Sequence, residues 1–322
     1  MKIKVLSNWM TAWLPERVAW QGAEFTRDAA CRDYDWLLVY DEMPEGCRRE
    51  ELACPAEHTI LVTQEPPTIK IFPPAYTRQF NYVLTTHTPR ELPHPHHRYG
   101  AGCFTWMNGR HPQHYLTAPE PEKTACISAI CTRKLMKNTE HYKRFLLFTH
   151  LQEHLPEFVW RGQGINPLKY KYEAMDAFKY HVVVENYIHA HHWSEKLADA
   201  FLSNCLPFYA GDSALEEILP PESFIRIPLE DPALALSIIR EAVAAGEYEK
   251  RLPAIREARR LILQKYNLWS QVLDTIAAHG RNPLAAPDPG RECILGRRVI
   301  RRNPLNWPGI LWNRIRLGLF RH

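Results

Sequence analysis

Residues 178–227 carry side chains and spacings that suit the binding of a phosphorylated ligand. An apolar, β-branched run ends abruptly in Glu185 and Asn186, and a histidine-rich loop then leads to Ser194, Glu195 and Lys196 at the start of an amphipathic pattern. A helix N-terminus has unpaired N–H groups and partial positive charge, and a lysine in its first turn adds a full cation. The neighbouring carboxylate can accept hydrogen bonds from sugar hydroxyls. The segment therefore predicts a site for a nucleotide-diphosphate sugar.

The same segment resembles the donor-binding signature of glycosyltransferase family 10, the α-1,3/1,4-fucosyltransferases. The resemblance rests on Glu185-Asn186, on Ser194-Glu195-Lys196, on the Pro-Phe-Tyr-Ala-Gly run at 207–211 and on the Pro-Glu-Ser-Phe-Ile run at 221–225. Where the family has a tyrosine, three residues before the glutamate, this chain has His192, whose imidazole can also stack or hydrogen-bond. The likeness is strong here and weaker over the remaining chain. It implies an α/β fold of the GT-B type, with two Rossmann-like domains facing a cleft.

The resemblance also implies an activity and a role for each motif residue. The activity is inverting transfer of fucose from GDP-fucose to a glycan hydroxyl, with GDP-fucose as a substrate and no cofactor or metal required. Lys196 would hold the diphosphate and offset the charge on the departing GDP, and Glu195 would bind ribose or fucose hydroxyls. An ordinary helix start with a surface lysine is the alternative for these two. The remaining donor-site residues of this motif are Glu185, Asn186, His192 and Ser194.

Arg144 lies in the run HYKRFLLFTHL, with leucines three and seven residues later. This pattern resembles the family helix that presents a phosphate-binding arginine to the donor. A guanidinium suits that role because its fork can grip two phosphate oxygens. A solvated arginine on an amphipathic helix is the alternative, and Lys143 competes for the same register.

Glu65 lies in the run LVTQEPPT, directly after an apolar stretch and before two prolines. The resembled family has a carboxylate in a Glu-x-Pro segment here, facing the acceptor. Inverting transfer needs one base to take the proton of the acceptor hydroxyl, and a carboxylate at a strand end suits this role. The alternative is a polar turn residue, and the register between Gln64 and Glu65 stays open.

Composition restricts the class of protein. The 322 residues are 45% hydrophobic and 24% charged, which is typical of a globular chain long enough for two domains. The net charge is +4, but residues 293–322 hold seven arginines and no acid, so the body is slightly acidic and a nucleic-acid-binding core is disfavoured. Eight cysteines without a Cys-x-x-Cys pair, and the lack of a long apolar stretch, predict a cytoplasmic protein. Animal members of the resembled family carry an N-terminal membrane helix, so a bacterial type is expected.

The apolar pattern predicts three regions. Residues 1–121 form an acceptor-side domain, with buried parallel strands at 2–6, 36–40, 59–63 and 82–84 and a long Pro-, His- and Gly-rich loop from 89 to 121. Residues 122–280 form the donor-binding domain, with strands at 125–131, 157–160 and 180–184. Its predicted helices cover 139–154, 168–177, 194–202, 231–245 and 252–278. Residues 281–322 form a basic tail.

The histidines between His87 and His114 invite a metal interpretation, but they lack the fixed ligand spacing of zinc sites. A polar acceptor-side loop is favoured, and no metal is predicted. Asp33-Tyr34-Asp35 precedes a strand instead of following one, which indicates a turn.

The tail interleaves arginines with aromatic and aliphatic residues such as Trp307 and Trp312. Such a segment can bury its apolar side in an anionic membrane surface, and a helix docked on the protein body is the alternative. The membrane interpretation predicts that a chain ended before Arg297 keeps both domains. We expect a peripheral inner-membrane enzyme acting on a glycan such as bacterial lipopolysaccharide. Transfer from another GDP-sugar, or non-catalytic nucleotide or glycan binding, remains open.

Overall fold

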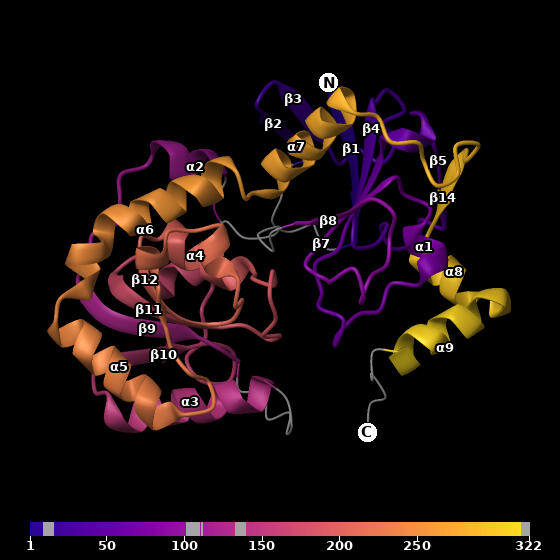
Figure 1. Cartoon of the computed structure of the whole chain (residues 1–322). Coiled ribbons are helices and arrows are strands. Elements are labelled where there is room, and N and C mark those ends of the chain that lie inside the picture. Colours follow the sequence, from indigo (N-terminus) through magenta and orange to yellow (C-terminus); the bar gives the residue numbers. More distant parts are fainter. Residues whose placement is uncertain (9–15, 101–109, 111, 133–139, 317–322) are drawn as a thin grey trace. The chain divides into compact units, whose positions relative to one another are not determined.

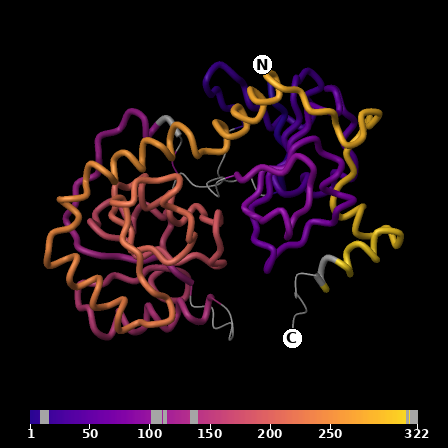
Figure 2. Tube along the Cα trace, viewed as in Figure 1, coloured from indigo at the N-terminus to yellow at the C-terminus, as the bar shows by residue number. Residues whose placement is uncertain are grey.

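The computed structural model describes residues 1–8, 16–100, 110, 112–132 and 140–316 (Figure 1). The chain divides into two compact units, Met1–Gly102 with Leu268–His322 (unit 1) and Cys103–Asn267 (unit 2). This division corrects the predicted one, because the chain returns to the N-terminal unit after Asn267 instead of ending in the donor-binding unit. The Cα trace in Figure 2 shows the same return, with the yellow C-terminal segment beside the indigo and violet strands of unit 1.

Unit 1 is built on a seven-stranded sheet in the order β2-β3-β1-β4-β6-β7-β8. Its paired strands are parallel apart from the β2–β3 hairpin, whose turn residues Gln21 and Gly22 both have positive φ. This turn geometry matches the twist of the two strands it joins. The strands are β1 (Lys2–Ser7), β2 (Arg17–Trp20), β3 (Ala23–Thr26), β4 (Trp36–Tyr40), β6 (Thr59–Val62), β7 (Tyr82–Thr85) and β8 (His97–Tyr99).

The four strands predicted from apolar runs are β1, β4, β6 and β7, and every residue of β4, β6 and β7 is buried. Continuous burial is expected of central parallel strands covered on both faces. Strand β8 and the short helix α2 (Pro112–Thr117) lie within the predicted loop at 89–121, so that prediction was wrong for these two elements. Residues 101–109 and 111 of the loop lie outside the described residues.

The predicted helix at 252–278 is two helices, α6 (Glu247–Gln264) in unit 2 and α7 (Leu268–Arg281) in unit 1. The side-chain amide of Asn267 donates to the Leu263 carbonyl at 2.8 Å and satisfies a carbonyl freed by the break. Helix α7 packs on the sheet of unit 1, where Trp269 contacts Phe25 with ring centroids 4.6 Å apart. The apolar periodicity continues through the break and therefore did not reveal it.

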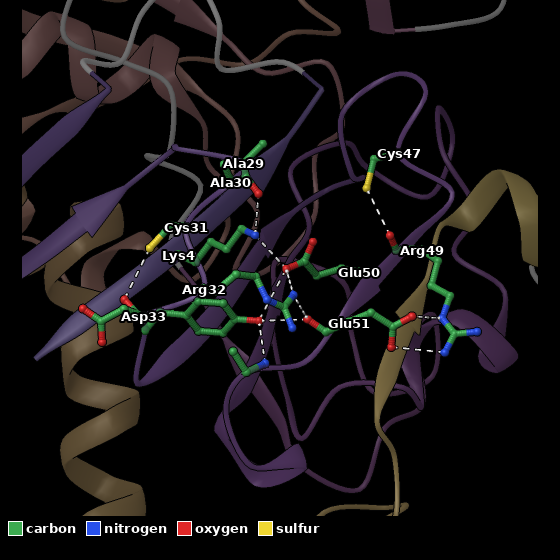
Figure 3. Close-up of polar contacts among 12 residues, drawn as sticks. Lys4, Ala29, Ala30, Cys31, Arg32, Asp33, Cys47, Arg49, Glu50 and Glu51 are labelled. Atoms are coloured by element: carbon green, nitrogen blue, oxygen red, sulfur yellow. Dashed lines mark hydrogen bonds and ion pairs between the residues drawn. The ribbon is translucent and has the colours of Figure 1, made fainter.

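The C-terminal segment up to residue 302 is part of unit 1. Strand β14 (Cys293–Leu295) pairs antiparallel with β5 (Arg49–Glu51), and the buried side chains of Ile294 and Ile300 join the core of the unit. Figure 3 shows how β5 is fixed in turn: the buried ammonium of Lys4 lies between the Ala29 carbonyl, at 2.8 Å, and the Glu50 carboxylate, at 2.7 Å. Removal of this segment would therefore expose core residues.

Helix α8 (Arg297–Arg302) is tied to the body by ion pairs of Arg297 with Glu42 and of Arg298 with Glu45. These contacts argue against the prediction that a chain ended before Arg297 keeps both domains intact, because Arg297 and Ile300 belong to unit 1. Only helix α9 (Trp307–Arg316), with the turn before it, retains the predicted exposed apolar character. The exposed side chains are Leu305, Trp307, Leu311, Trp312 and Ile315.

Unit 2 contains a five-stranded, all-parallel sheet in the order β10-β9-β11-β12-β13. In chain order this is 2-1-3-4-5, so the direction of winding reverses between β9 and β11, and ligands of such sheets bind at the carboxyl ends beside that switch point. Helix α4 packs against α6, and α3 packs against α5 (Figure 1). The strands are β9 (Ala125–Ile130), β10 (Phe158–Arg161), β11 (Phe178–Val184), β12 (Leu206–Ala210) and β13 (Ile225–Arg226).

Three predicted helices of unit 2 agree with the structure, whereas those at 168–177 and 252–278 do not. Helices α3 (Glu140–His154), α4 (Glu195–Leu202) and α5 (Pro232–Ala244) lie where they were predicted. Only a single 3-10 turn, η2 (Lys171–Ala174), forms within 168–177, because Tyr170 is extended and caps that turn together with Glu173. An extended residue cannot continue a helix, so the predicted element shrinks to the turn that follows it.

Candidate functional site

The candidate site lies at the carboxyl end of β11, beside the switch point of the unit 2 sheet. Glu185, the residue after this strand, is 1% exposed and accepts hydrogen bonds from Ser194, at 3.0 Å from the backbone N–H and 2.6 Å from the hydroxyl. A Cβ atom on Gly211, after β12, would lie only 2.7 Å from the Glu185 Cγ. Glycine is therefore required at 211 for the Glu185 side chain to occupy this position.

Ser194 is the N-cap of α4. Its backbone is extended, and its hydroxyl oxygen accepts from the backbone N–H of Lys196 at 3.3 Å. The same oxygen lies 3.1 Å from the Lys196 Nζ, which also contacts Glu195 at 3.2 Å and lies 3.7 Å from Glu185. The predicted helix start is confirmed, and it concentrates one ammonium, two carboxylates and one hydroxyl in the first turn.

Arg144, on α3, reaches the same edge of the sheet although its side chain is almost completely buried, at 5% exposure. Its Nη1 donates to the Asn186 side-chain oxygen at 2.7 Å and to the Val184 carbonyl at 3.4 Å, and its Nη2 donates to the His141 Nδ1 at 3.1 Å. Arginine has no acceptor, so the imidazole nitrogen of His141 must accept and this ring is neutral. Among the residues that the structure describes, the hydrogen-bond partners of this buried guanidinium are thus neutral groups, an arrangement that favours an added anion.

Lys143, the competing residue, points elsewhere. Its ammonium pairs with Glu140 at 3.2 Å and with Glu230 at 2.5 Å, and its side chain is 37% exposed. The geometry therefore places Arg144, and not Lys143, beside Asn186.

Two glutamates of the site have opposite pKa shifts. Burial raises the pKa of Glu185 above its ordinary value, and the nearby Lys196 reduces that effect only in part. Burial also opposes ionisation of Glu195, but the attraction of Lys196 and Lys171 outweighs it and brings the pKa of Glu195 well below the ordinary value. Glu195 is therefore ionised throughout the physiological range. Lys171, on η2, was not predicted from sequence because it lies far from the motif along the chain.

The loop at 187–193 is held by Asp212, which lies in the turn after β12. Asp212 accepts a hydrogen bond from the backbone N–H of His191 at 2.7 Å and another from Ala214 at 2.8 Å. His191 has a φ of 64°, a strained value for a residue with a side chain. His192 is buried and packs edge-on against Tyr187, with ring centroids 5.3 Å apart. The position of Asp212, just after a strand and a glycine, was the available signal.

Glu65 belongs to unit 1, where it is the third residue after β6 and is half-buried. Its backbone carbonyl accepts from the His87 Nε2 at 2.8 Å, and the preceding backbone N–H, of Gln64, donates to the buried Asp41 at 2.8 Å. Lys70 closes the loop by pairing with Asp41 at 3.3 Å and with Glu42 at 3.0 Å. The structure therefore places Glu65 on a hydrogen-bonded loop at a strand end of unit 1, whereas the donor-site residues belong to unit 2.

The histidine-rich region forms hydrogen bonds within unit 1. Ring nitrogens of His94, His96 and His97 donate to the carbonyl oxygens of Phe80, Asn81 and His87 at 2.8–3.1 Å. Within the described part of the chain, no group of three or more His, Cys, Asp and Glu side chains could hold a metal ion. Among the helices of the same residues, none combines the length and the apolar character that crossing a membrane requires.

Comparison with solved structures identifies the fold. Two crystal structures of an α1,3-fucosyltransferase, one of them with GDP, align at a TM-score of 0.50 and 14% identity, over 88% of this chain and 91% and 90% of those chains. The Anabaena protein HepE in complex with UDP-glucose aligns at a TM-score of 0.45 and 11% identity, over 77% of this chain and 79% of that chain. No protein-family model and no curated protein sequence matches this chain. The chain has the GT-B glycosyltransferase fold, as predicted.

Proposed function

We propose that this chain is an inverting glycosyltransferase that moves fucose from GDP-fucose to a hydroxyl of a glycan. The observation that carries the proposal is the buried guanidinium of Arg144, held by neutral partners at the carboxyl end of β11 and on the same sheet edge as the first turn of α4. A diphosphate would supply the missing negative charge. The α1,3-fucosyltransferase with the same fold was solved with GDP, which supports a guanosine diphosphate donor.

The donor-site residues then contact different parts of the donor. Arg144 and Lys196 contact phosphate oxygens, and Lys196 offsets the charge that develops on GDP as the bond to the sugar breaks. Glu195 accepts hydrogen bonds from ribose or fucose hydroxyls, and His192 packs against the donor in place of the tyrosine of the resembled family. Glu185 and Asn186 fix Ser194 and Arg144 in these positions.

Glu65 is the proposed base. It takes the proton of the acceptor hydroxyl as that oxygen attacks C1 of the sugar, and the bond between C1 and the phosphate oxygen breaks with its electron pair going to GDP. Attack opposite the leaving group inverts the configuration at C1. The hydrogen bonds of His87 and Asp41 to the backbone on either side fix this loop, which a base with a defined position requires.

Helix α9 is the proposed membrane contact. Its exposed tryptophans, with Leu311 and Ile315, form an apolar surface, and Arg301 and Arg302 precede it. Such a helix can rest on anionic lipid with its arginines at the headgroups. This location suits a lipid-linked acceptor such as lipopolysaccharide at the cytoplasmic face of the inner membrane.

Calorimetry and a donor panel test the proposal. The protein should bind GDP more tightly than UDP and release GDP from GDP-fucose when a glycan acceptor is present. Lys196→Ala should weaken GDP binding by about 1.5–3 kcal/mol, the usual worth of a hydrogen bond to a charged group. Lys250→Ala is the matched control, since this lysine is 60% exposed and pairs only at the surface with Glu247.

Each other outcome has a defined meaning. Transfer from a different GDP-sugar would replace fucose as the donor. GDP binding without transfer or hydrolysis of any donor would identify a non-catalytic binding protein. Equal GDP affinity of Lys196→Ala and the parent would remove Lys196 from the site.

A further inference from the structure

Lys171 lies against the first turn of α4 from a different part of the chain. Its ammonium, on η2, is 2.7 Å from the Asp199 carboxylate and 3.7 Å from Oε1 of Glu195. The same Oε1 atom is 3.2 Å from the Lys196 ammonium. One carboxylate oxygen of the candidate site therefore lies between two lysines.

Two ammonium groups and three carboxylates lie together here: Lys171 pairs with Asp199 and Glu195, and Lys196 pairs with Glu195 and lies 3.7 Å from Glu185. The Asp199 side chain is 1% exposed, and Lys171 supplies it with an opposite charge at 2.7 Å. Burial of Lys171 disfavours its charged form, but attraction to Asp199 and Glu195 outweighs this and raises the Lys171 pKa. Lys171 thus stays charged beside Glu195, and this carboxylate faces the ammonium groups of both lysines.

We propose that Lys171 is a positioning residue of the donor site: by sharing the Glu195 carboxylate, it leaves the Lys196 ammonium available to a diphosphate. The inference rests on the proposed function, because it concerns the same site. Without Lys171, Glu195 would be neutralised by Lys196 alone, and an incoming phosphate would have to compete with a full ion pair for that ammonium.

A double-mutant cycle with inorganic pyrophosphate tests the sharing directly. Pyrophosphate has no ribose or sugar, so the cycle does not depend on hydrogen bonds from Glu195 to donor hydroxyls. Lys171→Met should weaken pyrophosphate binding on the order of tenfold. An opposite charge within about 4–6 Å of an ionised group shifts the ionisation equilibrium of that group by at least this factor, and the charge lost here is the Lys171 ammonium beside the Glu195 carboxylate. Glu195→Gln should change the affinity little in the parent but restore most of it in the Lys171→Met background. Lys169→Met, at an exposed lysine two residues earlier, is the control and should bind like the parent.

Thermal unfolding of each variant separates binding from folding. If Lys171→Met does not fold because Asp199 loses its partner, the cycle is run with Lys171→Met/Asp199→Asn against Asp199→Asn. An unchanged affinity of Lys171→Met overturns the inference. An equal gain in pyrophosphate affinity from Glu195→Gln in the parent and in Lys171→Met also overturns the inference, since Lys171 would then act only as an additional positive charge. A parent that binds neither pyrophosphate nor GDP overturns the proposed function, and this inference with it.

Discussion

Replacement of Arg144 by methionine should separate binding from stability. The guanidinium is 5% exposed, and its contacts with Asn186, Val184 and His141 are hydrogen bonds to neutral groups. Burying an ion costs several kcal/mol even after relaxation, whereas each hydrogen bond from a charged group returns about 1.5–3 kcal/mol. These contributions nearly cancel. Arg144→Met should therefore change the free energy of unfolding by no more than about 1 kcal/mol.

In contrast to stability, donor binding should weaken strongly in Arg144→Met. A bidentate contact between guanidinium and phosphate is worth at least one charge-assisted hydrogen bond, so GDP affinity should fall by about 1.5–3 kcal/mol, roughly tenfold to more than a hundredfold. Calorimetric titration with GDP and urea unfolding of the same preparation measure the two effects. Lys143→Met is the matched control, because Lys143 is the next residue on α3 but pairs with Glu140 and Glu230 at the surface.

Two results would refute this reasoning. A loss of about 3–5 kcal/mol of stability is typical of a broken buried ion pair and would mean that Arg144 has a structural counter-ion. Normal GDP affinity of Arg144→Met, with weakened binding in Lys143→Met, would move the phosphate contact to the neighbouring register.

Three further predictions concern other parts of the chain. Glu65→Gln should keep GDP affinity and lower turnover by about 10²–10⁴, and near-normal turnover would transfer the role of base to another carboxylate. A chain ended after Asn303 should keep the stability of unit 1 and lose binding to anionic vesicles. A chain ended after Gly296 should instead lose at least about 2 kcal/mol of unfolding free energy, because Ile300 leaves the core. Equal stability of the two chains would contradict the docking of α8. Burial lowers the pKa of His181 from 6.5 to about 3, so stability is fully present above pH 6.5 and declines below it. Unfolding between pH 7 and pH 5 should show a loss of roughly 2 kcal/mol that His181→Asn lacks, and identical pH dependence of both proteins would refute it.

Local patterns predicted the elements that carry the donor site. The strand before Glu185, the N-cap at Ser194 and the helix that carries Arg144 follow from apolar runs, capping chemistry and helical spacing, and the structure confirms these three elements. Local patterns say nothing of partners that are distant along the chain. Lys171 enters the site through folding and has no signal of its own, whereas Asp212 is marked only by its position after a strand and a glycine.

The sequence of the tail likewise did not predict what the tail packs against. Arginines and large apolar residues alternate along 293–322 whether they face lipid or protein, so composition could not assign them. Pairing of β14 with β5 places Ile294 in the core, and helix α8 places Ile300 there; both side chains are buried. Strand β5 is only three residues long and carries charged side chains, which is why its sequence did not predict a partner for the tail.

Burial and neighbouring charges give the two glutamates of the site, Glu185 and Glu195, different roles. Glu185 accepts two hydrogen bonds from Ser194, and its burial raises its pKa. Glu195 lies ten residues further along the chain, between two ammonium groups, and stays ionised. A buried group with all its partners inside the protein suits positioning, whereas a partly exposed carboxylate can still accept from a ligand. We therefore expect Glu185 to act by fixing the start of α4, and Glu195 to be the residue that contacts the donor hydroxyls.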